Sequence, residues 1–392
     1  MTAAGRIEAD WLQAAPTRAV IRAIEAGGHE ALFVGGCVRN ALIGAPVSDI
    51  DIATDALPER VSALAEAAGL RVAPTGMAHG TVTLVSAGQG FEVTTFRRDV
   101  ETFGRAARVE FAGTLEEDAQ RRDFTMNALY ARPDGTVLDP VGGLRDLLAR
   151  RLRFIGRPED RIAEDYLRIL RFFRFHAWYG DPAGGIDPEG LAACAAHAAG
   201  LAKLSAERVG AELLKLLAAP DPAPSVAAMA QAGVLARVLP GADARALGPL
   251  VHLEGFVEVE PDPIRRLAAL GGEDVAVRLR LSRAQERRLG LLARALAEDE
   301  APALLAFEHG AQTARDAVLL RAALMGRALP ETLEAEVRRG AAAQFPLRAA
   351  DLPGNLEGAA IGDALTRLRQ AFKDSDLKAG RTELLALLSR PG

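Results

Sequence analysis

The feature that most constrains the fold is a glycine pair followed closely by two aspartates in an apolar run. The apolar run 31–34 predicts a short strand that enters the glycine pair 35–36, and the alternating run 48–53 predicts a second strand. Because side chains two positions apart share one face of a strand, we expect Asp49 and Asp51 on the same face. Two carboxylates held this close repel each other unless a cation lies between them, and Mg²⁺ is the usual cation.

The glycine pair also indicates contact with a phosphate. Without side chains, Gly35 and Gly36 allow backbone N–H groups to approach phosphate oxygens, and Arg39 adds a fixed guanidinium fork. Either pattern alone is weak, since most glycine pairs are turns and most Asp-x-Asp pairs are solvated strand ends. The two patterns together, at this spacing, favour nucleotidyl transfer.

Composition and length restrict the class of protein. The 392 residues are 49% hydrophobic but only 5% aromatic, which favours a largely helical chain with several domains. Two cysteines exclude a disulfide framework, and no segment resembles a signal peptide or a membrane span, so we expect a cytoplasmic protein. The net charge of −5 neither supports nor excludes an RNA partner.

The pattern changes from mixed to helical near residue 150, which predicts an α+β chain. Before that point we expect a helix over 16–27, a helix beginning at Pro58, and strands over 81–85 and 91–96 that form a hairpin. The charged stretch 97–117 is interpreted as a mobile loop over a site or as a solvated surface segment. The rest of the chain is predicted to be helical, including a helix capped by Ser205.

Five motifs in order along the first ~215 residues resemble the class II CCA-adding enzymes and bacterial poly(A) polymerases. This family of tRNA nucleotidyltransferases is similar to polymerase β-type enzymes. The motifs span residues 35–54, 121–129, 139–147, 164–174 and 204–209. The family usually has an aspartate where this chain has Asn40, which can hydrogen-bond but cannot bind a metal as an anion.

The resemblance implies a fold and a set of site residues. We expect a nucleotidyltransferase head over 1–150, a helical neck over 151–218 that recognises the base, and a helical body and tail over 219–392 that bind tRNA. Two Mg²⁺ ions are expected on Asp49 and Asp51, with Glu92 as a candidate third catalytic carboxylate or merely an exposed strand residue. The implied nucleotide-binding residues are Gly35, Gly36, Arg39, Arg121, Arg122, Asp123, Asn127, Asp165, Arg168, Arg171 and Arg174.

Base recognition is assigned to the fourth motif. On a helix, Asp165 and Arg168 would be i, i+3 neighbours, and Arg171 and Arg174 would continue the same face. In the family the matching Asp and Arg read the Watson–Crick edge of the incoming base. Composition alone would favour a solvated helix face here, and the motif context reverses that interpretation.

The expected activity is template-independent addition of CCA to the 3′ end of tRNA from CTP and ATP, with release of pyrophosphate. The pattern of 72–76 and 80–82 resembles the CCA-adding branch. Poly(A) synthesis, addition of only CC or only A, and a non-catalytic RNA-binding relative stay open as alternatives. Both a monomer and a homodimer stay open too.

The arginines 278, 280, 283, 287 and 288 are interpreted as a contact surface for tRNA phosphates or as a solvated helix surface.

Overall fold

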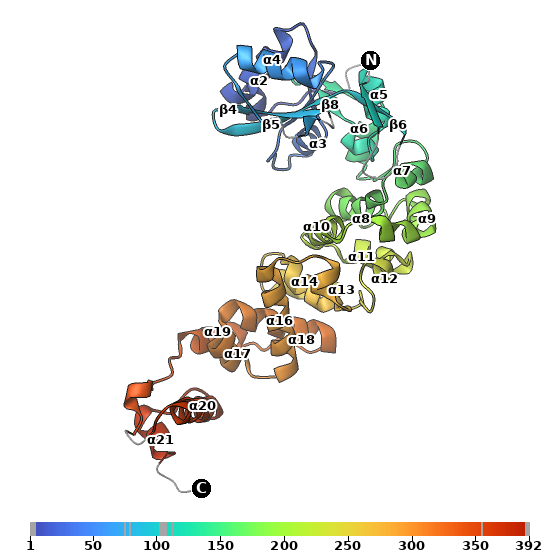
Figure 1. Cartoon of the computed structure of the whole chain (residues 1–392). Helices are drawn as coiled ribbons and strands as arrows, with labels where there is room; N and C mark the ends of the chain where they lie inside the picture. Colours follow the sequence, from blue (N-terminus) through green and yellow to red (C-terminus); the bar gives the residue numbers. More distant parts are fainter. Residues whose placement is uncertain are drawn as a thin grey trace. The chain divides into compact units, whose positions relative to one another are not determined.

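The computed structural model describes residues 5–73, 76–77, 80–101, 108–111, 113–353 and 356–388. It consists of two compact units, Met1–Pro240 and Gly241–Gly392 (Figure 1). The first unit contains a seven-stranded sheet and helices, and the second is built from helices. This confirms the predicted mixture of an α/β start and a helical remainder.

The sheet has the strand order β3-β4-β5-β2-β1-β8-β9. Its strands are antiparallel to their neighbours except for the central pair of β2 and β5, which is parallel. The bounds are β1 (Ala31–Val34), β2 (Asp51–Thr54), β3 (Arg71–Ala73), β4 (Thr81–Ser86), β5 (Gln89–Thr95), β8 (Tyr130–Ala131) and β9 (Val137–Leu138). The predicted first strand and the predicted hairpin are confirmed. An apolar run predicted the strand, and alternation with a Gly-containing turn predicted the hairpin.

The strand that carries the aspartates is shorter than the sequence suggested. It begins at Asp51, so Asp49 lies just before the strand instead of within the predicted run 48–53. Ile52, Ala53 and Thr54 are all buried, as expected of a strand in the middle of a sheet.

Helices of the first unit cover the sheet and continue beyond it. The helices α2 and α4 pack against each other and against β4 and β5, and α3 lies on the other side of the sheet (Figure 1). As predicted, α4 begins at Pro58, where the missing N–H costs nothing. The bounds are α1 (Asp10–Gln13), α2 (Ala15–Glu25), α3 (Gly36–Leu42), α4 (Pro58–Ala67), α5 (Leu115–Gln120), α6 (Gly143–Leu148), α7 (Pro158–Glu164), α8 (Leu167–Tyr179), α9 (Pro188–Ala196), α10 (Ala206–Leu217), α11 (Ala223–Gln231) and α12 (Val234–Val238).

A cluster of aromatic rings joins the sheet region to α8. The ring of Phe124 lies 4.9 Å from that of Phe154 and 5.3 Å from that of Phe175, and Phe154 stacks on Phe172 at 5.4 Å. All four side chains are buried, and such pairs stabilise beyond the area they remove from water. Motif 121–129 and the start of the helical region therefore share one core.

The charged stretch 97–117 is more regular than predicted in its described parts. It contains β6 (Arg97–Glu101), β7 (Arg108–Phe111) and the beginning of α5. β6 and β7 pair antiparallel, so cross-strand pairing overrides the weak local pattern. Residues 102–107 and 112 of this stretch, and residues 74–75 of the CCA-type pattern, lie outside the described residues.

The second unit has only helical elements among its described residues. They are α13 (Leu247–Phe256), α14 (Pro263–Leu270), α15 (Val275–Arg278), α16 (Arg283–Glu298), α17 (Pro302–His309), α18 (Ala311–Met325), α19 (Leu333–Ala342), α20 (Ala359–Asp374) and α21 (Arg381–Ala386), with a short 3-10 turn at Ala349–Asp351. Across the described part of the chain, no helix has the length and apolar character to cross a membrane.

A buried ion network connects four of these helices. Glu254 on α13 accepts from Arg265 and Arg266 on α14, at 2.8 and 2.7 Å. Asp316 on α18 accepts from Arg265 at 2.7 Å and from Arg288 on α16 at 2.8 Å. Arg288 also contacts Asp262 at 2.6 Å. Its guanidinium group is therefore engaged in ion pairs within the fold.

Candidate active site

The two predicted catalytic aspartates lie at the start of the central strand β2. Asp49 is exposed and accepts from the Ser48 hydroxyl at 2.9 Å, whereas Asp51 is half-buried. In the parallel pair of β2 and β5, Glu92 is the register partner of Asp51, so both side chains lie on one face of the sheet. Burial raises the pKa of Asp51 to about 6, with further contributions from the charges of Glu92 and Asp49 that Arg122 opposes.

This arrangement suits a divalent cation. The negative charge of Asp49 disfavours the ionised form of Asp51, and a cation between the two carboxylates would remove that repulsion. Mg²⁺ is commonly bound by one or two carboxylates, with phosphate and water oxygens completing its shell. Among the described residues no group of three acidic, His or Cys side chains is arranged to hold a metal. A metal-binding or catalytic role for Glu92 therefore stays a prediction.

The glycine pair brings the second motif close to α3. Gly35 has a φ of +69°, a left-handed conformation that glycine adopts without strain, and its N–H donates to the Leu129 carbonyl at 3.0 Å. A Cβ at Gly35 would lie 3.6 Å from Nη1 of Arg122 and 3.6 Å from the Asn127 carbonyl oxygen. Gly36, the first residue of α3, would place a Cβ 3.9 Å from Arg39 Nη2. The lack of side chains keeps this space open beside two guanidinium groups.

The guanidinium group of Arg122 donates to a buried carboxylate and to a hydroxyl. Its Nε and Nη2 donate to Asp118 at 3.1 and 2.9 Å, and its Nε also donates to the Tyr130 hydroxyl at 2.9 Å. Arg121 donates to the same carboxylate at 3.2 Å. Although burial raises it, the pKa of Asp118 is lowered to about 2 by Arg122 and Arg121. Asp118 was not predicted as a partner, and its i, i+4 spacing from Arg122 was the signal that could have indicated it.

Arg39 is buried, with 6% of its surface exposed, and the partners it has within the described part of the chain are neutral. Its Nη1 donates to Asn127 Oδ1, and its Nη2 donates to the Tyr179 hydroxyl at 2.7 Å. Nε and Nη2 both donate to Asn40 Oδ1, at 3.2 and 2.9 Å. Asn40 thus hydrogen-bonds, as predicted for this departure from the family's aspartate. The predicted contact of Arg39 with phosphate stays a prediction.

Asp123 and Asn127 connect the second motif to α8. Asp123 Oδ1 accepts from the Phe124 N–H at 2.8 Å and from Asn127 Nδ2 at 3.0 Å. Asp123 Oδ2 accepts from Nε of Arg171 at 2.7 Å and from its Nη2 at 2.5 Å. Despite burial, these contacts lower the pKa of Asp123, with the charge of Arg171 as the largest favourable cause. The implied role of Asp123 and Asn127 in nucleotide binding stays a prediction.

The predicted helical spacing of Asp165 and Arg168 is wrong. Asp165 has extended backbone angles, φ −151° and ψ 107°, and lies between α7 and α8. Its Oδ1 accepts from the Leu167 N–H at 3.1 Å and its carbonyl accepts from the Arg168 N–H at 2.9 Å, so it caps α8. Aspartate competes for these N–H groups and therefore favours helix starts over helix interiors.

Arg168 lies in the first turn of α8 and reaches back to the second motif. Its Nη1 contacts Glu164 and donates to the Arg161 carbonyl at 2.9 Å, and its Nη2 donates to the Arg121 carbonyl at 3.1 Å. Its side chain is 13% exposed. The motif at residues 121–129 and the motif at residues 164–174 are thus directly hydrogen-bonded.

The fifth motif supplies a partner that the sequence did not reveal. Arg208 on α10 donates to Asp165 Oδ2 at 2.6 Å, and Glu212 one turn later accepts from Arg174 at 2.5 Å. Arg171 also lies 4.0 Å from Glu212. The i, i+4 spacing of Arg208 and Glu212 places both on one face of α10, and this was the signal in the sequence that could have indicated their pairing with α8 and Asp165. Ser205 precedes α10 as predicted, but its side chain makes no capping bond.

Two segments of the chain match known families. Residues 31–153 match the family described as "Poly A polymerase head domain", and residues 185–245 match "Probable RNA and SrmB- binding site of polymerase A". The human protein named "CCA tRNA nucleotidyltransferase 1, mitochondrial" is 33% identical over 387 residues, covering 92% of this chain and 87% of that protein. The chain belongs to the family of CCA-adding enzymes and poly(A) polymerases. Divalent metal use is implied for this nucleotidyltransferase family.

Two further relatives differ in how much of the chain they match. The "CCA-adding enzyme" of Lacticaseibacillus paracasei is 45% identical over 204 residues, so the match spans 52% of this chain and half the length of that relative. A crystal structure of the Bacillus stearothermophilus CCA-adding enzyme in complex with CTP is 29% identical. It has a TM-score of 0.71 and covers 96% of this chain and 97% of the other.

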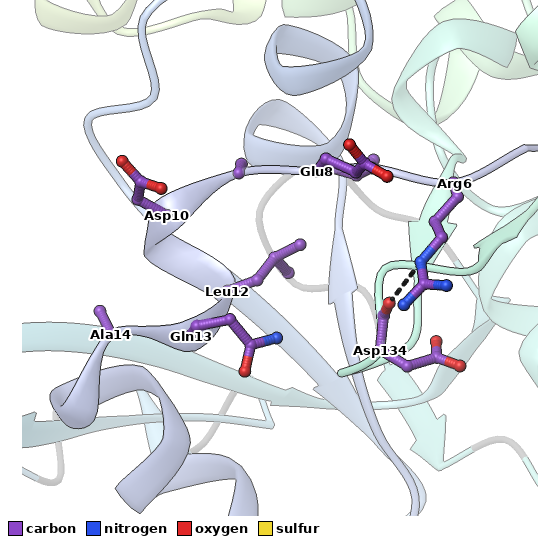
Figure 2. Close-up of a pocket in the computed structure, with 9 residues that line it drawn as sticks. Arg6, Glu8, Asp10, Leu12, Gln13, Ala14 and Asp134 are labelled. Carbon is purple, nitrogen blue, oxygen red and sulfur yellow. Dashed lines mark hydrogen bonds between the residues drawn. The ribbon is translucent and has the colours of Figure 1, made fainter.

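A separate hollow lies near the N-terminus (Figure 2). It has a volume of about 500 Å³ and is lined by residues of α1, the segment before it and Asp134. Arg6 closes one side by donating to the Asp134 carbonyl at 3.2 Å. None of the predicted site residues lines this hollow, so it is distinct from the candidate active site.

Proposed function

We propose that this chain adds CCA to the 3′ end of tRNA from CTP and ATP, without a template and with release of pyrophosphate. One observation carries the proposal: a single stretch, 121–123, contacts both parts of the site. Arg122 lies beside Gly35, and its charge lowers the pKa of Asp51, while the Arg121 carbonyl and the Asp123 carboxylate accept from Arg168 and Arg171 of α8. A stretch that links the carboxylates to the base-reading helix would hold the reacting phosphate and the base in fixed relation.

The carboxylate end of the site would align the reacting groups. Two divalent ions, which we propose are Mg²⁺, would be held by Asp49 and Asp51. One would lower the pKa of the RNA 3′ hydroxyl, and the other would stabilise the charge of the triphosphate and of the leaving pyrophosphate. Nη1 of Arg122, which faces the glycine pair, would donate to phosphate oxygens. The contribution of these side chains is alignment and charge, which dominate phosphoryl-type transfer.

The other end would select the base. Cytosine and adenine both present an exocyclic amine beside a ring nitrogen. The amine can donate a hydrogen bond to the Asp165 carboxylate, and the ring nitrogen can accept one from Arg168. Guanine and uracil present a carbonyl oxygen at the place of that amine. Arg208 would hold the Asp165 carboxylate in one orientation, and Glu164 would do the same for Arg168.

We propose that the parts of the chain divide this work as the sequence suggested. Residues 1–150 would act as the nucleotidyltransferase head, 151–218 as the neck that recognises the base, and 219–392 as the body and tail that bind tRNA. The match of residues 185–245 to a probable RNA-binding family supports RNA contact by the helical region.

The test uses purified protein, Mg²⁺ and three tRNA transcripts that end before CCA, after C and after CC. Each transcript receives CTP, ATP or both, and the 3′ ends are sequenced. Completion to CCA from all three transcripts is the expected result. Long A tails would indicate poly(A) synthesis, and a stop at CC or action only on the CC end would indicate a partial enzyme. Binding of tRNA with no incorporation would indicate a non-catalytic relative.

A further inference from the structure

Three guanidinium groups of the candidate site gather around one buried ring. The Cζ atoms of Arg39, Arg171 and Arg174 lie 5.2, 5.2 and 4.4 Å from the centroid of the Phe175 ring, which is 5% exposed. The face of an aromatic ring attracts a cation but carries no net charge, so the ring holds a cation without neutralising it.

Tyr179, one turn farther along α8, holds Arg39 in two ways. The Cζ of Arg39 lies 4.0 Å from the centroid of the Tyr179 ring, and the Tyr179 hydroxyl accepts from Nη2 at 2.7 Å. The rings of Tyr179 and Phe175 lie 5.6 Å apart, so the two aromatic residues form one support. Because Tyr179 is only half-buried, it can be replaced with less damage to the core than Phe175.

The charges of this cluster do not balance. Within the described residues, the carboxylates in ion-pair contact with it are Asp123 and Glu212, which serve Arg171 and Arg174. Arg39 has no carboxylate in ion-pair contact there. Three guanidinium groups against two carboxylates leave one positive charge. Burial lowers the pKa of Arg39, and the charge of Arg174 adds to this effect, while Tyr179 and Asp123 oppose it.

A buried cation without a contacting anion is costly unless a bound anion completes it. We infer that Phe175 and Tyr179 are positioning residues for the triphosphate of the incoming nucleotide. They contact Arg39 through their rings and the Tyr179 hydroxyl, which carry no net charge. One positive charge of the three arginines therefore stays uncompensated and can bind the anionic ligand. This inference rests on the proposed function. Because CTP and ATP share the triphosphate, the aromatic pair should affect both nucleotides equally and leave base choice untouched.

The test replaces Tyr179 and measures nucleotide and pyrophosphate binding. In Tyr179→Leu, which removes ring and hydroxyl, KM for both CTP and ATP should rise about threefold to tenfold. Tyr179→Phe, which keeps the ring, should show a smaller rise. Inhibition by inorganic pyrophosphate should weaken in parallel, while discrimination against UTP and GTP and the Tm should stay near wild type. A purely structural role would not produce this split.

The neighbouring Trp178 provides a matched control. It is 41% exposed, and its Nε1 donates to the Lys215 carbonyl at 2.9 Å. Trp178→Leu should leave KM and pyrophosphate inhibition unchanged.

Two kinds of result would overturn the inference. Unchanged KM and unchanged pyrophosphate inhibition in Tyr179→Leu would refute it, while CCA addition by the wild type would leave the proposed function intact. Altered discrimination between bases in that variant would also refute it. Absence of nucleotide addition by the wild type would refute the proposed function instead, and calorimetric binding of pyrophosphate would still report on Tyr179. If the leucine variant does not fold, Tyr179→Phe carries the test.

Discussion

A buried ion network of the second unit and buried Arg39 of the first unit have opposite kinds of partner. In residues 241–392, Arg265, Arg266, Glu254 and Asp316 are each at most 3% exposed, and every carboxylate meets at least one guanidinium group. With Arg288 and Asp262 at the edge, three cations face three anions. In residues 1–240, Arg39 is 6% exposed, and its partners among the described residues are neutral oxygens and rings.

Burial of a charge therefore does not by itself distinguish a structural role from a functional one. A buried network whose charges balance is complete without any ligand, and removing one member leaves a partner uncompensated. A buried cation whose partners are neutral has positive charge left for an anion that comes from outside the fold. On this basis we assign the network of Arg265, Arg266, Glu254 and Asp316 to the fold and propose that the cluster around Phe175 serves nucleotide binding.

The largest effect is expected at the carboxylates of the first unit. Asp49→Asn and Asp51→Asn should each slow nucleotide transfer about a thousandfold, because each removes a ligand of the proposed metal and several kcal/mol of transition-state stabilisation. Binding of tRNA should stay near the wild-type value. Single-turnover incorporation of CMP and a filter-binding assay measure the two quantities. Equal activity of variants and wild type would refute the metal assignment.

The balanced network should respond in stability and not in binding. Glu254→Gln should lower the free energy of unfolding by about 3 to 5 kcal/mol, since it leaves Arg265 and Arg266 buried without this carboxylate. Urea denaturation measures this loss, and KM for CTP should not change. As a control, Glu308→Gln breaks a partly exposed pair with Arg369 and should cost about 1 kcal/mol or less. A raised KM with unchanged stability in Glu254→Gln would erase the contrast between the networks.

A smaller effect is expected at the partner of Asp165. Arg208→Gln should reduce discrimination against UTP and GTP about tenfold, because the Asp165 carboxylate loses its charge-assisted hydrogen bond. Arg208→Lys should restore part of the discrimination, since lysine keeps the charge but not the planar fork. Competition between paired nucleotides on a tRNA that ends before CCA measures the ratio. A loss of stability with unchanged discrimination would assign Arg208 to the fold alone.

Local patterns predicted much of the first unit. An apolar run predicted β1, and alternation with a glycine turn predicted the hairpin of β4 and β5. A proline at the first helical position predicted the start of α4. Short-range competition caused the main error, because Asp165 caps α8 instead of lying within a helix. The charged stretch after β5 was misjudged because strand pairing, and not local composition, orders β6 and β7.

The partners of the site residues could not be predicted, because they lie far away in the sequence. Arg39 meets Asn127 and Tyr179, which are 88 and 140 positions away. Asp165 meets Arg208, 43 positions away. A motif shows which side chains are present, whereas only tertiary packing decides whether a buried guanidinium meets a carboxylate or an aromatic ring. The difference between the two networks is therefore visible only in the folded chain.

The most direct measurement is a calorimetric titration of inorganic tripolyphosphate, in the presence of Mg²⁺, into wild type, Arg39→Gln and Arg288→Gln. Arg39 belongs to the cluster with excess positive charge, and Arg288 to the balanced network of the second unit. We expect Arg39→Gln to weaken binding about tenfold, which corresponds to about 1.4 kcal/mol, and Arg288→Gln to bind as the wild type does. Unchanged affinity in Arg39→Gln, or an equal loss in both variants, would contradict this account.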